Sequence, residues 1–211
     1  MRKITYVFLM FSALLSFTAI SASTETADEW LKKANELSDG QKYTDPLKAV
    51  EYLNKALKLQ PHDAETYYNR GVAYDNLGQY KQAIKDYDQA IRLKPDYAEA
   101  FYNRGIVNNI IGQYQRAIED FNETIRINPK DVEAYLGLGF ACDKIHQYQL
   151  AIENYGKAIG LQPDYAKAYN NRGSAYFSQG NNRQGCFDAQ KACILGNCKL
   201  LKIAREKGIC R

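Results

Sequence analysis

The sequence predicts an all-α protein in which about five helical hairpins stack on one another and a closing helix caps the C-terminal end. Prolines recur every 34 residues, at Pro61, Pro95, Pro129 and Pro163. Glycines recur with the same spacing, at Gly71, Gly105, Gly139 and Gly173. Aromatic residues follow it too, at Tyr67, Phe101, Tyr135 and Tyr169. A period this strict indicates one supersecondary unit that packs against its own copies.

Residues 64–97 show how one unit is expected to fold into two helices. Small and aromatic residues at spacings of three and four mark one face of each helix. These faces are Tyr67, Gly71 and Tyr74 in the first helix, and Ala83, Tyr87 and Ala90 in the second. Gly78 is expected to end the first helix, because glycine adopts the left-handed conformation that helix ends often need. Pro95 lies past the second helix, where its missing amide does least harm.

The stretch YYNRGVAYDNLGQYKQAIKDYDQAIRLKP within this unit closely resembles the tetratricopeptide repeat (TPR). The resemblance implies a TPR solenoid that occupies nearly all of the chain after its N-terminal segment. The expected units are a degenerate first repeat at 29–63, repeats at 64–97, 98–131, 132–165 and 166–199, and a disulfide-stapled capping helix within 200–211. The closing helix itself is expected near Lys199–Lys207.

Several positions depart from the repeat pattern. His146 replaces the turn glycine of its unit, and Gly185 replaces a packing alanine. In the first unit, Trp30, Ala34 and Leu37 mark the first helix and Ala49, Leu53 and Ala56 mark the second. The loop between these two helices is longer than in later units. Thr44 or Asp45 is expected to cap the second helix, with Pro46 in its first turn.

Residues 1–22 have the features of a secretory signal peptide. Arg2 and Lys3 precede an apolar stretch at 4–20, which small residues follow. This pattern predicts cleavage after residue 21, 22 or 23, and a mature protein that is exported to the periplasm or secreted. The alternative is an uncleaved anchor that holds the protein on the membrane, facing the periplasm or the exterior. The apolar stretch is at the short end for a spanning helix.

The cysteines predict two disulfides at the C-terminal end, as expected in an oxidising compartment. Cys186 and Cys193 are about 10 Å apart along one helix, and Cys198 and Cys210 flank the closing helix at about 18 Å. A disulfide needs α-carbons within about 7 Å, which excludes those two pairs. An antiparallel turn near 196 favours Cys193–Cys198 and Cys186–Cys210. Cys142 is expected to be a buried packing residue.

Composition argues against several functions. The net charge is +4, and removal of Arg2 and Lys3 leaves 26 − 24 = +2, too little for a nucleic-acid-binding protein. The two histidines form no metal motif, and no phosphate-binding loop or catalytic constellation is recognisable. We therefore expect no enzyme activity, no metal and no cofactor. A thiol-redox protein is the remaining enzymatic alternative, but no cysteine pair has the CxxC spacing.

The resemblance also implies where a ligand binds, since the first helix of each TPR unit lines the concave face. The expected ligand-binding residues are Tyr68, Asn69, Val72, Tyr102, Asn103, Ile106, Asn109, Phe140, Asn170 and Asn171. Side-chain amides at Asn69, Asn103 and Asn171 can pair with the backbone of an extended peptide, although Gly137 interrupts this row. The alternative is that these asparagines bond their neighbours while Arg70, Arg104 and Arg172 form salt bridges within the array.

The sequence thus predicts a non-catalytic, exported protein–protein interaction scaffold that binds a peptide or protein segment in its concave face. The alternative is a membrane-tethered subunit of a cell-envelope assembly or secretion complex, held by an uncleaved N-terminal segment. Chaperone-binding TPR domains clamp a terminal carboxylate with lysines, and the corresponding positions here hold Tyr68, Tyr102 and Glu99. The partner is therefore not expected to be a chaperone tail.

Overall fold

The computed structural model describes residues 25–40 and 42–210, and the described chain forms helices without any strand, which confirms the all-α class. The predicted export signal at 1–22 lies outside the described residues. The helices are α1 (Ala27–Asn35), α2 (Pro46–Leu59), α3 (Ala64–Asn76), α4 (Tyr80–Leu93), α5 (Ala98–Ile110), α6 (Tyr114–Ile127), α7 (Val132–Lys144), α8 (Tyr148–Leu161), α9 (Ala166–Ser178), α10 (Asn182–Ile194) and α11 (Lys199–Glu206).

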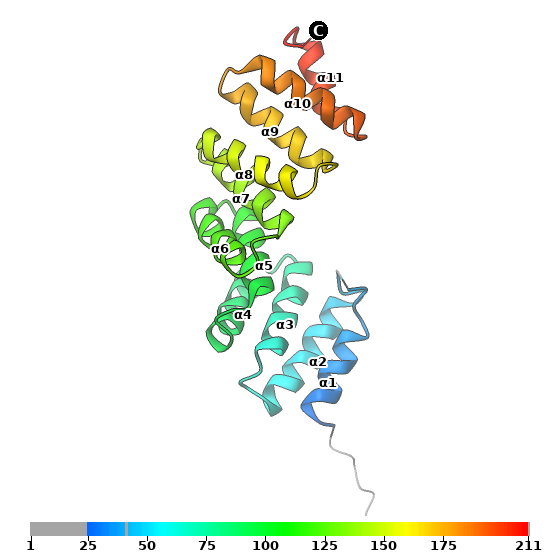
Figure 1. The fold of residues 1–211 in the computed structure, drawn as a ribbon. Coiled ribbons are helices and arrows are strands. Elements are labelled where there is room, and N and C mark those ends of the chain that lie inside the picture. The colour runs from blue at the N-terminus through cyan, green and yellow to red at the C-terminus, as the bar shows by residue number, and fades with distance from the viewer. Residues whose placement is uncertain (1–24, 41, 211) are drawn as a thin grey trace, which may run out of the picture.

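The helices pair as consecutive hairpins that stack into a curved, elongated array running from α1 to α11 (Figure 1). Each helix packs against the helix before it and the helix after it. The odd-numbered helices also contact one another, since α5 touches both α3 and α7, and α9 touches both α7 and α11. These first helices therefore form a continuous surface, the concave face, while the even-numbered helices lie behind it.

Left-handed residues end the first helix of each full unit, as expected for Gly78. The backbone φ angle is +69° at Gly78 and +62° at His146, which occupies the same place in its unit. In both turns the next amide donates to a carbonyl in the last helical turn, from Gln79 to Tyr74 and from Gln147 to Cys142. The backbone is thus the same in both units, although a side chain at positive φ is less favourable there than glycine.

The repeated glycines allow the two helices of a unit to pack at close range. A Cβ atom added at Gly71 would lie 2.7 Å from Cε1 of Tyr87 on α4, and one at Gly139 would lie 2.6 Å from Cε1 of Tyr155 on α8. Both tyrosines are almost completely buried. In these two units the second helix therefore places a large ring against the bare backbone of the first.

Buried ion pairs join the two helices of three units. Arg70 binds Asp86 at 2.7 Å, and the equivalent pairs are Arg104–Asp120 and Arg172–Asp188. These are the salt bridges within the array that the sequence left as one interpretation of the arginines. The fourth unit instead has Leu138 and Asn154, and the Asn154 amide donates to the Leu150 carbonyl within its own helix. Both partners are therefore replaced together, so that no buried charge is left unpaired.

The first unit is less regular than the others. Helix α1 begins at Ala27, two residues before the predicted unit, and ends at Asn35, so Leu37 lies in the following turn instead of in the helix. Leu37 still packs against the core formed with Ala34 and Leu53. Asp45 is the N-cap of α2, where its side chain accepts from the Lys48 amide.

Disulfides close the C-terminal end of the array. Cys186 on α10 is bonded to Cys210, and Cys193 is bonded to Cys198 across the turn before α11. These are the pairs that the helix spacing predicts. The ring of Phe177 explains why Gly185 replaces the packing alanine of other units, because a Cβ atom at residue 185 would lie 2.5 Å from that ring. Cys142 is buried and free, and burial raises the pKa of its thiol.

Candidate functional site

The concave face contains three cavities that follow one another along the array. The N-terminal cavity is about 710 Å³ and lies between the loop at 38–43, α3 and the start of α5. The central cavity is about 500 Å³ and lies between α5, α7 and α9. The C-terminal cavity is about 240 Å³ and lies between α7, α9 and α11. Together the three form a groove, and this name is used for them below.

Every predicted ligand-binding residue lines at least one of these cavities. The N-terminal cavity contains Tyr68, Asn69, Val72, Tyr102 and Asn103. The central cavity contains Tyr102 again, with Ile106, Asn109, Phe140 and Asn171. The C-terminal cavity contains Phe140, Asn170 and Asn171. The groove thus brings together on one face the positions that the family resemblance implied.

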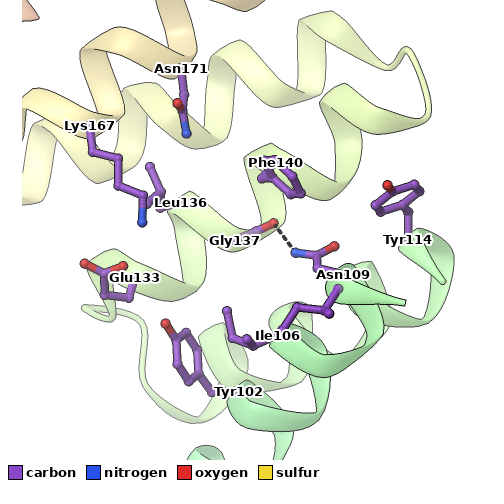
Figure 2. A pocket seen from close by; sticks show the side chains of 11 residues that line it. Tyr102, Ile106, Asn109, Tyr114, Glu133, Leu136, Gly137, Phe140, Lys167 and Asn171 are labelled. Carbon is purple, nitrogen blue, oxygen red and sulfur yellow. Dashed lines mark hydrogen bonds between the residues drawn. The ribbon is translucent and has the colours of Figure 1, made fainter. Parts of the chain in front are cut away.

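The central cavity has an apolar floor and a polar rim (Figure 2). Ile106, Leu136 and Phe140 contribute apolar surface from two neighbouring helices, and Phe140 remains 36% exposed. Glu133 and Lys167 lie on the side of the cavity away from Tyr114. Such a combination suits a ligand that buries an apolar side chain and meets charged groups beside it.

Packing explains why Gly137 interrupts the row of asparagines. A Cβ atom at residue 137 would lie 2.6 Å from Cζ of Phe121, a ring that is fully buried on α6. No asparagine fits there without moving that ring. The bare backbone leaves the Gly137 carbonyl open to the Asn109 amide, which donates to it at 3.4 Å (Figure 2).

The other asparagines bond within the array. Asn69 donates to the side-chain oxygen of Asn35 at 3.2 Å, and Asn103 donates to the Tyr68 hydroxyl at 3.0 Å. In each case the partner belongs to the preceding unit. The interpretation that these amides bond their neighbours therefore describes the ligand-free groove, and contact with a peptide stays a prediction.

Burial and carboxylates act together on the tyrosines of the groove. Burial, with smaller contributions from Tyr68 and Glu65, raises the pKa of Tyr43 to about 12. Burial, with Glu133 and Asp131, raises the pKa of Tyr102 to about 12. These hydroxyls are therefore neutral donors and acceptors at physiological pH.

Acidic or amide side chains occupy the end of the first helix in three consecutive units, at Asp75, Asn109 and Asp143. Burial raises the pKa of Asp75, although Lys42 acts in the opposite direction. Burial also raises the pKa of Asp143, against the influence of Lys144 and His146. The oxygen Oδ1 of Asp143 is buried without a hydrogen-bond partner in the described chain. Its ionised form is therefore poorly solvated in the ligand-free groove.

The first turns of the first helices carry charged residues. They hold Glu65, Glu99 and Glu133 in three units and Lys167 in the next. An acidic residue is favourable at a helix N-terminus, whereas a lysine opposes the helix dipole. Lys167 has no ion-pair or hydrogen-bond partner in the described part of the chain and lines the central cavity.

Other groove residues could be found only from the structure. Tyr43 comes from the irregular loop of the first unit, and Lys199, Leu200 and Ile203 come from α11. Neither segment follows the repeat pattern, so the period gives no signal for them. Comparing first-turn charges between units would have identified Glu133 and Lys167.

No group of three or more His, Cys, Asp or Glu residues with metal-binding geometry occurs in the described chain. None of the helices described combines the length and apolarity that crossing a bilayer requires.

Comparison with known proteins links these features to one family. A tetratricopeptide repeat family model matches residues 64–97 and 98–131, and a second TPR repeat model matches 47–78 and 146–180. The chain is 38% identical over 60 residues to the Hsp70-Hsp90 organizing protein of Triticum aestivum, and 40% identical over 60 residues to Hsp70-Hsp90 organizing protein 1 of Glycine max. These stretches are 28% of this chain and 10% of each relative.

Solved structures match over most of the chain. A crystal structure of MamA is 30% identical, with a TM-score of 0.70, over 72% of this chain and 88% of that one. MamA from Desulfovibrio magneticus RS-1 is 26% identical, with a TM-score of 0.76, over 82% of this chain and 96% of that one. YrrB, described as a TPR protein with an unusual peptide-binding site, has a TM-score of 0.76 at 24% identity, over 90% of this chain and 96% of that one. The likeness to YrrB shows the fold alone.

Proposed function

Because the chain belongs to the tetratricopeptide repeat family, we propose that it is a non-catalytic scaffold that holds a segment of a partner protein in its groove. The observation that carries this proposal is the central cavity between α5, α7 and α9. Its apolar floor suits one buried side chain. The Asn171 amide lines this cavity and the Asn103 amide lines the N-terminal cavity, where each can exchange internal bonds for bonds to a peptide backbone.

The relatives support this proposal only in general terms. The wheat and soybean proteins are named as organisers of Hsp70 and Hsp90, and the matched stretch is a tenth of their length. Their partners therefore do not carry over as such. At Tyr68 and Tyr102 this chain has phenols where a carboxylate clamp uses lysine, so the proposed ligand is a segment of different chemistry.

A selection from a random peptide library tests the groove. The immobilised mature protein is expected to enrich peptides that share an apolar residue. Phe140→Asp, which places a carboxylate in the central cavity, should weaken binding of such a peptide at least tenfold. Leu150→Asp is the matched control, because Leu150 is 46% exposed on the outer helix α8. Equal binding by both variants, or the absence of any enriched peptide, would contradict the proposal.

We also propose that the protein is exported, with residues 1–22 removed. The basic and apolar pattern of that segment supports this, and so do two disulfides in one chain. The competing possibility is an anchored protein that keeps the segment and performs the same binding at the membrane. Intact mass spectrometry of the native protein separates the two. Export is supported by a mass that lacks residues 1–22 and also lacks the four thiol hydrogens lost when two disulfides form. A full-length mass with free thiols contradicts it.

A further inference from the structure

The N-terminal cavity is built by a segment that the other units lack. The loop between α1 and α2 is fixed by the Thr44 amide and hydroxyl, which both donate to the Leu37 carbonyl, at 2.8 and 2.9 Å. The Tyr43 amide donates to the Asn76 side chain of the next unit at 2.8 Å. These bonds hold Tyr43, which is only 7% exposed, against α3. The irregular loop is therefore a wall of the groove.

The lining of this cavity is aromatic and acidic. Tyr43, Tyr68 and Tyr102 line it together with the Glu65 carboxylate, and no lysine or arginine is among its described lining residues. The Tyr68 ring also packs on Tyr97, with ring centroids 5.0 Å apart. Tyrosine faces carry partial negative charge, and they attract cations most strongly where water is largely excluded. The tyrosine faces and the Glu65 carboxylate thus both make the electrostatic potential in the cavity negative.

The charged residues around the cavity also favour a negative electrostatic potential inside it. Burial first, and then the charge of Glu99, raises the pKa of Tyr68. Two lysines lie near the site without lining it. Lys42 acts on Asp75, and Lys94 lies over the Tyr97 ring at 4.5 Å from its centroid. Neither is among the described lining residues, so no cationic side chain lines the cavity.

We propose that the N-terminal cavity binds a cationic side chain, arginine or lysine, of the segment held in the groove. This inference rests on the proposed function and assigns a partner chemistry to one end of it. The cation lies against the faces of Tyr68 and Tyr102 and pairs with Glu65. The Asn69 amide nitrogen is committed to Asn35 at 3.2 Å, which leaves its oxygen as an acceptor for an N–H donor. An anionic group would find no counter-charge in this lining.

NMR titration of the full mature chain tests the cavity with simple probes, acetyl-arginine amide and its neutral analogue acetyl-citrulline amide. The arginine probe should shift the amide signals of Tyr43, Tyr68 and Tyr102 in a saturable way, with at least fivefold tighter binding than citrulline. Glu65→Gln should weaken the arginine probe about fivefold. Glu153→Gln, which removes an exposed carboxylate on the outer helix α8 and lines none of the three cavities, should leave it unchanged.

Equal binding of the two probes, binding that Glu65→Gln does not alter, or no shifts at millimolar probe would overturn the inference. The amide spectrum reports at the same time whether each variant is folded. Failure of the cation site can be distinguished from failure of the proposed function. A library that enriches peptides without basic residues contradicts the cation site alone, whereas a library that enriches nothing contradicts binding in the groove.

Discussion

The side chain that is absent at Gly71 determines how closely α3 and α4 can pack. Gly71→Ala would place a Cβ atom 2.7 Å from the buried ring of Tyr87. We expect it to destabilise the protein by about 1–3 kcal/mol, because the ring cannot move without displacing the core. Gly160→Ala is the matched control, since nothing lies within 4 Å of its added Cβ. That variant should stabilise its helix by up to about 1 kcal/mol. Denaturant unfolding of both variants measures the contrast, and equal effects would contradict this packing.

The carboxylate of Asp143 gives a pH-dependent prediction. Burial raises the pKa of Asp143, so the folded protein holds this proton more tightly than the unfolded chain and the ionised form lowers stability at neutral pH. Asp143→Asn copies Asn109, the equivalent residue one unit earlier. We expect a higher Tm than wild type at pH 7, with a gain that disappears below about pH 4, where Asp143 is protonated in both states.

Thermal unfolding of the two proteins between pH 3 and pH 8 checks this difference. Lys144, His146 and Tyr155 act electrostatically on Asp143 or are acted on by it, and they are the same in both proteins, so the two curves differ only through residue 143. A variant with a lower Tm at pH 7 would show that the carboxylate has a partner in the folded state. If Asp143→Asn does raise the Tm at pH 7, the natural Asp143 lowers stability, as residues of binding sites often do.

Between the helices of a unit, the buried ion pair is stabilising only while both partners are present. Asp188 is almost completely buried and accepts two bonds from Arg172, at 2.7 and 2.9 Å. Arg172→Leu alone should cost about 3–5 kcal/mol, because it leaves an unpaired buried charge. Arg172→Leu with Asp188→Asn copies the Leu138 and Asn154 of the fourth unit and should recover most of that loss. Urea unfolding of the single and double variants measures the coupling, and additive effects would contradict it.

The closing helix α11 depends on its disulfides in a comparable way. The Cys186–Cys210 bond spans 24 residues, whereas Cys193–Cys198 spans five. Removing the longer bridge with Cys186→Ser and Cys210→Ser should cost about 3 kcal/mol, chiefly by releasing α11. Removing the shorter bridge should cost less. Hydrogen exchange should show faster exchange in α11 and α10, with α3 to α6 unchanged; uniform loss of protection along the array would contradict local stapling.

The period of the sequence accounts for the full hairpins because each unit repeats the same local signals. The spacing of Gly71 and Tyr87, the turn at Gly78 and the proline after four of the second helices suffice to place the helices. The resemblance to the TPR family, not the period, implied that Asn69, Ile106 and Phe140 lie on the concave face. It could not reveal which partner each asparagine bonds in the free groove, since those bonds join side chains of adjacent units.

The N-terminal cavity was not predictable from the period. Its wall depends on the loop at 38–43, which has no counterpart in later units, and on the burial of Tyr43 by bonds to Asn76. Sequence reasoning treated this loop as a longer connection only. The capping helix contributes Leu200 and Ile203 to the C-terminal cavity for a similar reason, because it occupies the place of a further repeat without having its sequence.

Across the whole molecule, the groove changes in charge from one end to the other. The first turns carry Glu65, Glu99 and Glu133, followed by Lys167 on α9 and Lys199 on α11. A segment bound along the groove therefore meets Glu65 in the N-terminal cavity, then Glu133 and Lys167 in the central one. In the C-terminal cavity it meets Lys144 and Lys199 beside Asp143. This gradient gives the groove a direction, so that a segment with opposite charges at its two ends would bind in one orientation.

The central claim is that the partner lies on the concave face, and site-specific photo-crosslinking in the native organism tests it most directly. A benzophenone-bearing phenylalanine analogue is placed at Phe140 in the central cavity or, as the control, at exposed Gln115 on the outer helix α6. The account predicts a discrete covalent adduct from position 140 and none from position 115. Adducts from position 115 with none from position 140 would place the partner on the outer face and contradict the account.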